Sequence, residues 1–249
     1  MLPALPNTNG GLIENLFLCR LSSPVIAFNS AIVSFMSRTS SLCGVILAAG
    51  DSTRMGTDKA LLPWPPSTPG TPNSAGQTFL SAAILALRPF TQAVVVVAGK
   101  NADKLAAVVY ASGALLVQNP DPERGQFSSL QVGLHEVLAR GCDGAMIMPV
   151  DRPPLSAATL EQLRSSFALA LSRGRWGVAP ENDGEHGHPL LASRELIEVF
   201  LRASPTSNAR EVKRAHAQYI EYVAVPDPFV SANVNTPEEY KALSTPPPK

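Results

Sequence analysis

The stretch CGVILAAGDSTRMGTDK, residues 43–59, joins an apolar segment to a loop that carries glycines and cations. Its first seven residues, 43–49, are apolar throughout, which predicts a short strand covered on both faces. The loop then holds Gly50, Gly56, Arg54 and Lys59. Glycines let backbone N–H groups approach an anion, and guanidinium and ammonium groups suit phosphate oxygens. We therefore expect a polyphosphate site at the carboxyl end of a sheet strand.

Apolar runs and helical periods alternate along the rest of the chain. Further strands are expected at 93–98, 114–118, 144–150 and 188–193, and an antiparallel strand near an edge at 219–225. Apolar stripes with a helical period lie between them, for example at Phe79, Leu80, Ala83, Ile84 and Leu87. This alternation predicts a three-layer α/β/α, Rossmann-like fold with a mostly parallel mixed sheet.

The length, net charge and cysteine content of the chain exclude several classes of protein. The chain has 249 residues, 45% of them hydrophobic, and 20 basic residues balance 20 acidic ones. That length suits one sizeable core, and a balanced charge gives no global field that would attract nucleic acid or an anionic membrane. Three cysteines without a CxxC pair favour buried thiols in a reducing compartment over a disulfide framework or a zinc site. We expect a cytoplasmic protein.

The first 42 residues carry no part of this pattern. The apolar run at 24–36 is too short to span a bilayer and contains Asn29, and no Lys or Arg precedes Arg20 as a secretory signal would require. We expect residues 1–42 to be a disordered extension or the product of a misplaced start, with Met36 as the alternative start. The folded domain is expected at 43–245, followed by a frayed tail at 246–249.

The loop does not match the two best-known phosphate motifs. A Walker loop would need Gly-Lys-Ser/Thr, and the dinucleotide fingerprint would need GxGxxG; neither is present. From spacing alone, an ordinary solvated loop with two surface cations remains the alternative.

The stretch LAAGDSTRMGTDK nevertheless resembles the LAAGxSxRMGxxK signature of MobA-like nucleotidyltransferases. The similarity continues, in family order, through PVDRPPL (149–155), GHPLL (187–191) and NVNTPEEY (233–240), and so covers residues 43 to about 243. The resemblance implies transfer of CMP or GMP from an NTP to molybdopterin, with relatives acting on sugar and alcohol phosphates. It implies Arg54, Lys59 and Asp151 as catalytic residues. The nucleotide-binding residues that it implies are Leu47, Ala48, Ala49, Gly50, Ser52, Arg54, Met55, Gly56, Lys59, Ser128 and Ser129.

Two residues are candidates for holding Mg²⁺. Asp151 follows an apolar strand and stands among Pro149, Pro153 and Pro154, which limit its loop. A rigid carboxylate there suits a metal ion that contacts phosphates, although a charged turn before a helix capped by Ser156 explains it equally well. The segment NTPEE (235–239) forms a capping box that leaves Asn235 unexplained. The resemblance implies that Asn235 is the second metal ligand.

Ser128, Ser129 and His188 have open alternatives. The serines lie in GQFSSLQVGL (125–134), where the resemblance places them near the nucleotide base and where helix capping is the simpler interpretation. His188 is a candidate for contact with the acceptor or a structural histidine. His135, His186 and His216 show no partner pattern.

The absence of a Ser/His/Asp or Cys/His set fits transfer to a phosphate, because an anionic phosphate needs no general base. The sequence predicts a Mg²⁺-dependent nucleotidyltransferase that acts on a phosphorylated acceptor, by resemblance molybdopterin, with a molybdoenzyme or its chaperone as a candidate partner. By the same resemblance, LAAG and GHP favour CTP, whereas NVN favours GTP; we favour CTP. A sugar- or alcohol-phosphate transferase and a weakly catalytic NTP- or cofactor-binding escort protein are the alternatives.

Overall fold

The computed structural model describes residues 41–50, 56–66, 76–204 and 206–243, all within one compact unit, Arg38–Lys249. The expected extension (apart from residues 41 and 42) and the expected tail lie outside the described residues, as do Ser52, Arg54 and Met55. No helix in the described part of the chain has both the length and the apolar character needed to cross a membrane.

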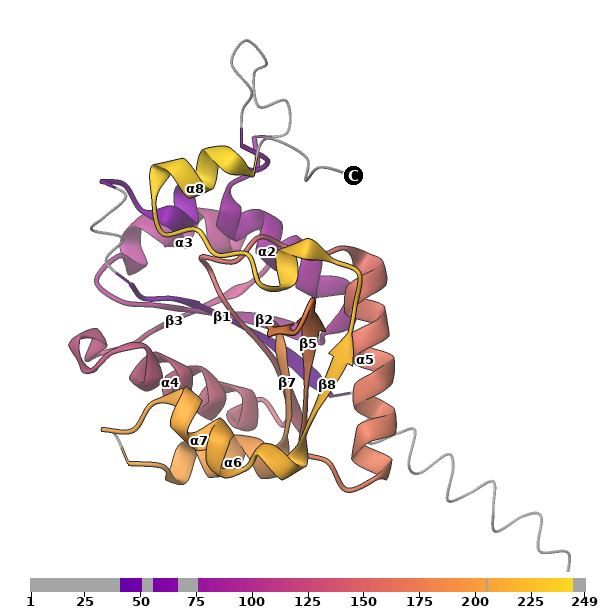
Figure 1. The fold of residues 1–249 in the computed structure, drawn as a ribbon. Helices are drawn as coiled ribbons and strands as arrows, with labels where there is room; N and C mark the ends of the chain where they lie inside the picture. The colour runs from indigo at the N-terminus through magenta and orange to yellow at the C-terminus, as the bar shows by residue number, and fades with distance from the viewer. Residues whose placement is uncertain (1–40, 51–55, 67–75, 205, 244–249) are drawn as a thin grey trace, which may run out of the picture. The chain divides into compact units, whose positions relative to one another are not determined.

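A mixed sheet forms the centre of this unit (Figure 1). Its parallel half has the order β3-β2-β1-β4, and β4 pairs with the antiparallel β7, which pairs in turn with β5. β5 also pairs with the short antiparallel β6 and with the parallel β8. The strand bounds are β1 Leu42–Ala48, β2 Ala93–Ala98, β3 Leu115–Gln118, β4 Gly144–Pro149, β5 Gly177–Asn182, β6 Glu185–His186, β7 Leu190–Ser193 and β8 Ile220–Ala224.

Helices cover both faces of the sheet, as Figure 1 shows. One buried cluster joins α2, α3 and α5 to one face, and a second cluster joins α4, α6 and α7 to the other. The helix bounds are α2 Phe79–Leu87, α3 Ala102–Ala111, α4 Gln126–Ala139, α5 Ala157–Ser172, α6 Arg194–Arg202, α7 Ala209–Ala215 and α8 Pro237–Ala242. Short 3₁₀ turns are η2 Lys59–Leu61, η3 Arg88–Phe90, η4 Pro122–Arg124, η5 Ala217–Tyr219 and η6 Pro228–Val230. The predicted three-layer α/β/α fold is confirmed.

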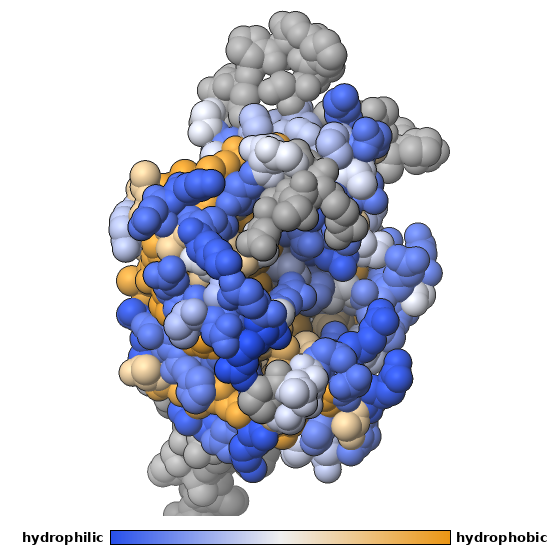
Figure 2. All heavy atoms as spheres, turned by 90° about the vertical axis from the view of Figure 1, so that its left-hand side faces the viewer, coloured by the Kyte–Doolittle hydropathy of each residue, from blue (hydrophilic) through white to orange (hydrophobic). Residues whose placement is uncertain are grey.

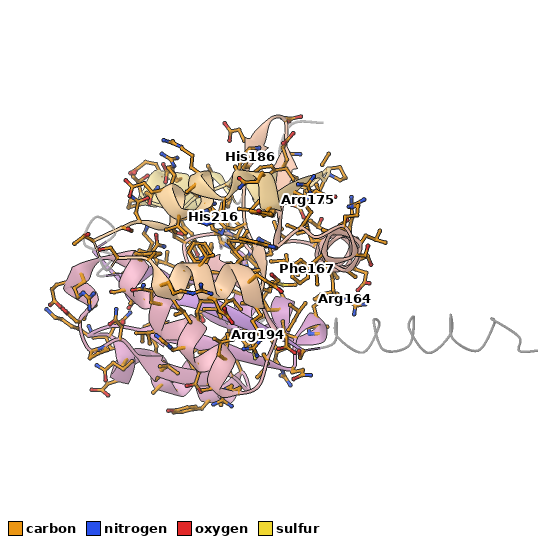
Figure 3. The ribbon with its side chains drawn as sticks, turned by 90° about the horizontal axis from the view of Figure 1, so that it is seen from below. Arg164, Phe167, Arg175, His186, Arg194 and His216 are labelled. Carbon is orange, nitrogen blue, oxygen red and sulfur yellow. The ribbon has the colours of Figure 1, made fainter. Side chains whose placement is uncertain are left out.

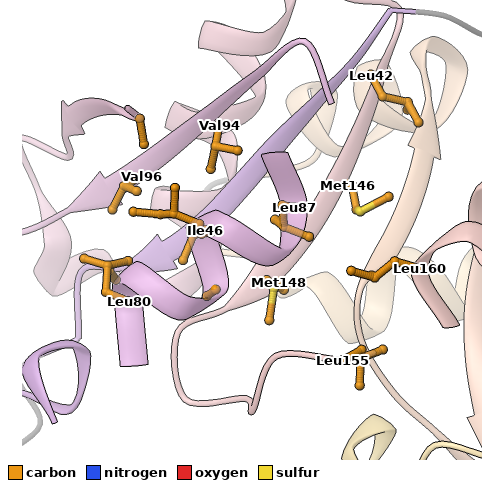
Figure 4. Close-up of a cluster of buried hydrophobic side chains, with 14 of the residues drawn as sticks. Leu42, Ile46, Leu80, Leu87, Val94, Val96, Met146, Met148, Leu155 and Leu160 are labelled. Atoms are coloured by element: carbon orange, nitrogen blue, oxygen red, sulfur yellow. The ribbon is translucent and has the colours of Figure 1, made fainter. Parts of the chain in front are cut away.

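The predicted apolar stripes form the core. All five stripe residues of α2 are buried, and Figure 4 shows Leu80 and Leu87 beside Ile46 of β1 and Val94 of β2. β1 and β2 are buried over nearly their whole length, as the unbroken apolar runs predict. The core thus fixes the strands whose carboxyl ends carry the loops of interest.

The predicted direction of the last strand is wrong. The segment expected as an antiparallel strand over 219–225 is β8, and it runs parallel to β5 in a register that pairs Gly177 with Ile220. The alternation of apolar and polar residues has the same period in both directions, so it could not decide between them. β5 itself went unpredicted, because its sequence GVAPEN is interrupted by Pro180 and ends in polar residues.

Close packing of α4 on the sheet sets the position of its first turn. A Cβ on Gly133 would lie 2.7 Å from Val45 Cγ1 and 2.9 Å from Val97 Cγ2, so any larger residue would push the helix outward. The amino end of α4 is thereby held beside the carboxyl ends of β1 and β2, where the predicted phosphate loop begins.

Candidate active site

A cavity of about 450 Å³ lies at the carboxyl ends of β1 and β4. Figure 2 looks onto the side of the molecule where β1 ends and shows mainly hydrophilic residues around its centre. The lining of the cavity combines the end of β1, the η4 turn, the first turn of α4 and the loop after β4. The lining residues are Leu47, Ala49, Gly50, Lys59, Pro122, Glu123, Gly125, Gln126, Ser129, Pro149, Val150, Asp151 and Asn235.

Three predicted site residues from distant parts of the chain meet at this cavity. Lys59 Nζ donates a hydrogen bond to Asn235 Oδ1 at 3.1 Å and lies 3.9 Å from Asp151 Oδ2, so these two oxygens are at most about 7 Å apart. The Lys59 side chain is only 12% exposed and that of Asp151 is 29% exposed. An ammonium, a carboxylate and an amide oxygen therefore share one partly enclosed space.

Backbone contacts hold Asp151 against the segment that carries Asn235. Val150 N donates to Leu47 O at 2.9 Å, and Val234 N donates to Asp151 O at 2.9 Å. Arg152 adds two further hydrogen bonds to this segment: its Nη1 donates to Ser231 O at 2.7 Å and to Ala232 O at 2.9 Å. These contacts connect β1, the loop after β4 and the 231–235 segment into one support.

A capping box closes this support. Thr236 accepts from Glu239 N, and Glu239 Oε2 accepts from both Thr236 N and Asn235 N. The capping interpretation of NTPEE is thus confirmed, and it fixes the Asn235 backbone as well. The Asn235 side chain remains directed to Lys59.

Asn101 supports the turn that carries Lys59, through hydrogen bonds to neighbouring residues. Its Nδ2 donates to Ala48 O at 3.0 Å and to Asp58 Oδ2 at 2.7 Å, while its Oδ1 accepts from Gly99 N at 3.0 Å. Asp58 in turn caps the η2 turn by accepting from Ala60 N at 3.1 Å. The sequence did not single out Asn101, because its partners Ala48 and Asp58 come from another segment that only folding brings near.

Ser128 and Ser129 have different positions. The buried Asn119 Nδ2 donates to Ser128 Oγ at 2.8 Å and to Ser129 Oγ at 3.0 Å. Ser128 Oγ donates to Gly125 O at 2.8 Å and does not line the cavity, whereas Ser129 does. The geometry therefore favours the structural interpretation for Ser128 and leaves Ser129 as the candidate for base contact.

The remaining predicted loop residues are only partly brought to the cavity. Leu47, Ala49 and Gly50 line it, whereas the Ala48 carbonyl is turned to Asn101. Gly56 has a positive φ of 65° and lies outside the lining.

His188 lies beyond the cavity lining, at the start of β7 beside the carboxyl half of β4. Its backbone N–H donates to Val230 O at 3.4 Å, and its Nδ1 is buried without a hydrogen-bond partner in the described part of the chain. Burial, followed by the charges of Lys213 and Arg152, lowers the pKa of His188 to about 3, against a smaller opposing contribution from the Ile147 carbonyl. The ring is therefore neutral near pH 7.

Two of the other histidines are engaged elsewhere (Figure 3). His186 stacks on Tyr222 with ring centroids 3.6 Å apart, and His216 lies 6.0 Å from the Trp176 ring. These contacts explain both residues without a role at the cavity.

Asp151 and Asn235 offer the oxygen donors that a hard cation needs. No group of three or more His, Cys, Asp or Glu side chains suited to a metal occurs among the described residues. Mg²⁺ commonly takes one or two protein oxygens and completes its shell with water and phosphate oxygens. One carboxylate and one amide in the lining of a cavity of about 450 Å³ fit that requirement.

The chain is similar in sequence to known nucleotidyltransferases. A family model for the MobA-like NTP transferase domain matches residues 44–219. A probable molybdenum cofactor guanylyltransferase from Rhodopirellula baltica is 30% identical over 203 residues, which cover 80% of this chain and 89% of the relative. The molybdenum cofactor cytidylyltransferase of Escherichia coli K12 is 25% identical over 198 residues, covering 76% and 93%.

Solved structures show the same fold. Rv0371c from Mycobacterium tuberculosis H37Rv superimposes with a TM-score of 0.64 at 23% identity, covering 83% of this chain and 100% of that one. A complex of Rv0371c with manganese superimposes with a TM-score of 0.59 at 23% identity, covering 82% and 98%.

Proposed function

We propose that this chain, which belongs to the MobA-like NTP transferase family, transfers CMP from CTP to the terminal phosphate of molybdopterin or its molybdenum form and releases pyrophosphate. The observation that carries the proposal is the meeting of Lys59, Asp151 and Asn235 at one cavity. Relatives named as guanylyl- and cytidylyltransferases of the molybdenum cofactor support this choice of acceptor.

The transfer needs charge neutralisation and alignment more than proton abstraction. An oxygen of the acceptor phosphate bonds to the α-phosphorus of the NTP as the bond from that phosphorus to the bridging β-phosphate oxygen breaks, and the electron pair leaves with pyrophosphate. Lys59 lines the cavity and supplies a positive charge for the phosphates. Because the attacking phosphate is already anionic at neutral pH, no residue of this chain has to act as general base.

Asp151 and Asn235 would hold Mg²⁺, which neutralises phosphate charge when bound. Both are held by backbone contacts and the Glu239 capping box before substrate arrives. Electrostatic catalysis works best when the charged groups need little rearrangement, and this support provides that condition. We extend the catalytic role to Arg54 as a proposal from the resemblance alone.

The preference for CTP rests on the resemblance of LAAG (47–50) and GHP (187–189) to members that transfer CMP. Ala49 is among the residues that line the cavity, and glycine at this position would lack its methyl group. A pyrimidine needs less room than a purine. Ala49→Gly should therefore raise the rate with GTP relative to CTP.

The test is pyrophosphate release by the full chain with each of the four NTPs, with and without molybdopterin. We expect release only when both CTP and molybdopterin are present. Release with CTP and a sugar phosphate instead would assign a different acceptor. Tight CTP binding without any release would identify a binding protein and contradict the proposal.

A further inference from the structure

The ammonium of Lys59 lies close to an oxygen of each proposed metal ligand. It lies 3.1 Å from Asn235 Oδ1 and 3.9 Å from Asp151 Oδ2, and the Lys59 side chain is only 12% exposed. This arrangement is more than a surface ion pair, because the same two oxygens are the ones that would face a divalent cation.

A divalent cation and the ammonium would compete for these oxygens. Mg²⁺ binds oxygens at about 2.1 Å. An ion held by both ligands would therefore lie close to the ammonium, which is near both side chains. The ion and the ammonium would then repel each other at short range in a partly enclosed space. Binding of the ion would therefore favour departure of the ammonium.

We propose that Lys59 is a built-in counter-ion for Asp151 that also donates to Asn235, and that a divalent cation displaces its ammonium into the cavity, where it meets the triphosphate. This inference rests on the proposed function, because the metal pair is proposed there. It adds a coupling step: arrival of the metal makes the lysine available to the nucleotide.

The local structure permits such a movement of the side chain alone. The backbone at Lys59 is fixed by the Asp58 cap and by Asn101. The side chain is a flexible four-carbon stem, and it already lines the cavity. The ammonium can therefore turn from the ligand pair towards the cavity while the η2 turn stays in place.

Displacement of the ammonium would couple metal binding to nucleotide binding. If the cation and the ammonium compete for one pair of oxygens, and the triphosphate attracts the ammonium away from that pair, then metal and nucleotide must strengthen each other's binding reciprocally. Without Lys59 that part of the coupling is lost. In the metal-free protein the same contact balances the Asp151 charge.

The first measurement is Mn²⁺ binding to the full chain without nucleotide, followed by electron paramagnetic resonance. Lys59→Met should bind Mn²⁺ at least several-fold more tightly than the parent, because no ammonium has to be displaced. Lys104→Met, which removes an exposed lysine from α3, is the matched control and should leave the affinity unchanged. Equal or weaker binding by Lys59→Met would overturn the inference.

The second measurement follows the lysine itself. Acylation by an amine-reactive reagent, quantified per residue by mass spectrometry, should become several-fold faster at Lys59 when Mn²⁺ is added, with Lys104 as the internal control. Asp151→Asn should abolish this response. If Mn²⁺ binds to the parent but leaves the Lys59 rate unchanged, displacement is wrong while the metal pair stands. If Mn²⁺ does not bind to the parent at all, the inference and the proposed metal pair both fail.

Discussion

Replacing Asp151 by Asn removes one charge and almost no volume. The variant keeps the backbone bond from Val234 N to residue 151, since that bond uses the main-chain carbonyl. It also keeps an oxygen that can face Lys59. What it loses is the only carboxylate that we assign to the metal.

The expected effect on turnover is large. Loss of one preorganised electrostatic group costs about 2.7–4 kcal/mol in the transition state, which corresponds to a fall of about 10²–10³ in rate. The expected effect on stability is small. The carboxylate lies 3.9 Å from Lys59 Nζ and is 29% exposed, so solvent screening should limit the loss to about 1 kcal/mol or less.

The assay is the initial rate of pyrophosphate release at saturating CTP and molybdopterin, together with Mn²⁺ titration and thermal melting. Asp143→Asn is the matched control, because Asp143 precedes the same strand, β4, that Asp151 follows, and pairs with Arg194 far from the cavity. That control should keep its turnover. Full activity in Asp151→Asn, or the same loss in both variants, would refute the reasoning.

Four further outcomes are expected. Lys59→Ala should weaken NTP binding about 10- to 100-fold, the range expected from losing charge-assisted contacts of about 1.5–3 kcal/mol; unchanged affinity in calorimetry would remove Lys59 from the site. Ser129→Ala should change the ratio of CTP to GTP rates, whereas Ser128→Ala should mainly lower the melting temperature because its hydroxyl bonds Gly125 O. The His188 pKa is about 3 in the folded chain against an ordinary value of 6.5, so between these pH values the unfolded chain binds a proton at His188 and the folded chain does not. The free energy of unfolding should therefore fall as the pH drops below about 6.5. His188→Gln should reduce this pH dependence, as measured by urea titration at several pH values. A chain that begins at Met36 should melt cooperatively and bind CTP like the full chain, and loss of either property would show that residues 1–35 are needed.

The strands and helices with clear patterns could be predicted from the sequence. Unbroken apolar runs identified β1, β2 and β4, because strands buried on both faces carry no polar positions. The direction of β8 could not be predicted in the same way, since the period of a strand is independent of its neighbour's direction. Its partner strand β5 could not be predicted from an apolar run, because Pro180 interrupts β5 and the strand ends in polar residues.

The candidate site could be predicted as a set of residues but not as a set of contacts. The motifs brought Lys59, Asp151 and Asn235 into consideration, and the structure places them together. The supporting amides Asn101 and Asn119 were not foreseen, because each acts through residues from other segments that only folding brings near. Local patterns report periodicity and caps, whereas such cross-chain hydrogen bonds leave no periodic signal.

The most direct test of the account follows the nucleotide itself into product. The full chain is incubated with CTP labelled at the α-phosphate, Mg²⁺ and molybdopterin, and the label is then located by chromatography and mass spectrometry. We expect the label to move to the acceptor as a CMP adduct, in equal amount to the pyrophosphate released, and we expect Asp151→Asn to leave it in CTP. Label that stays in CTP, or that appears as free CMP with no adduct, would contradict nucleotidyl transfer to this acceptor.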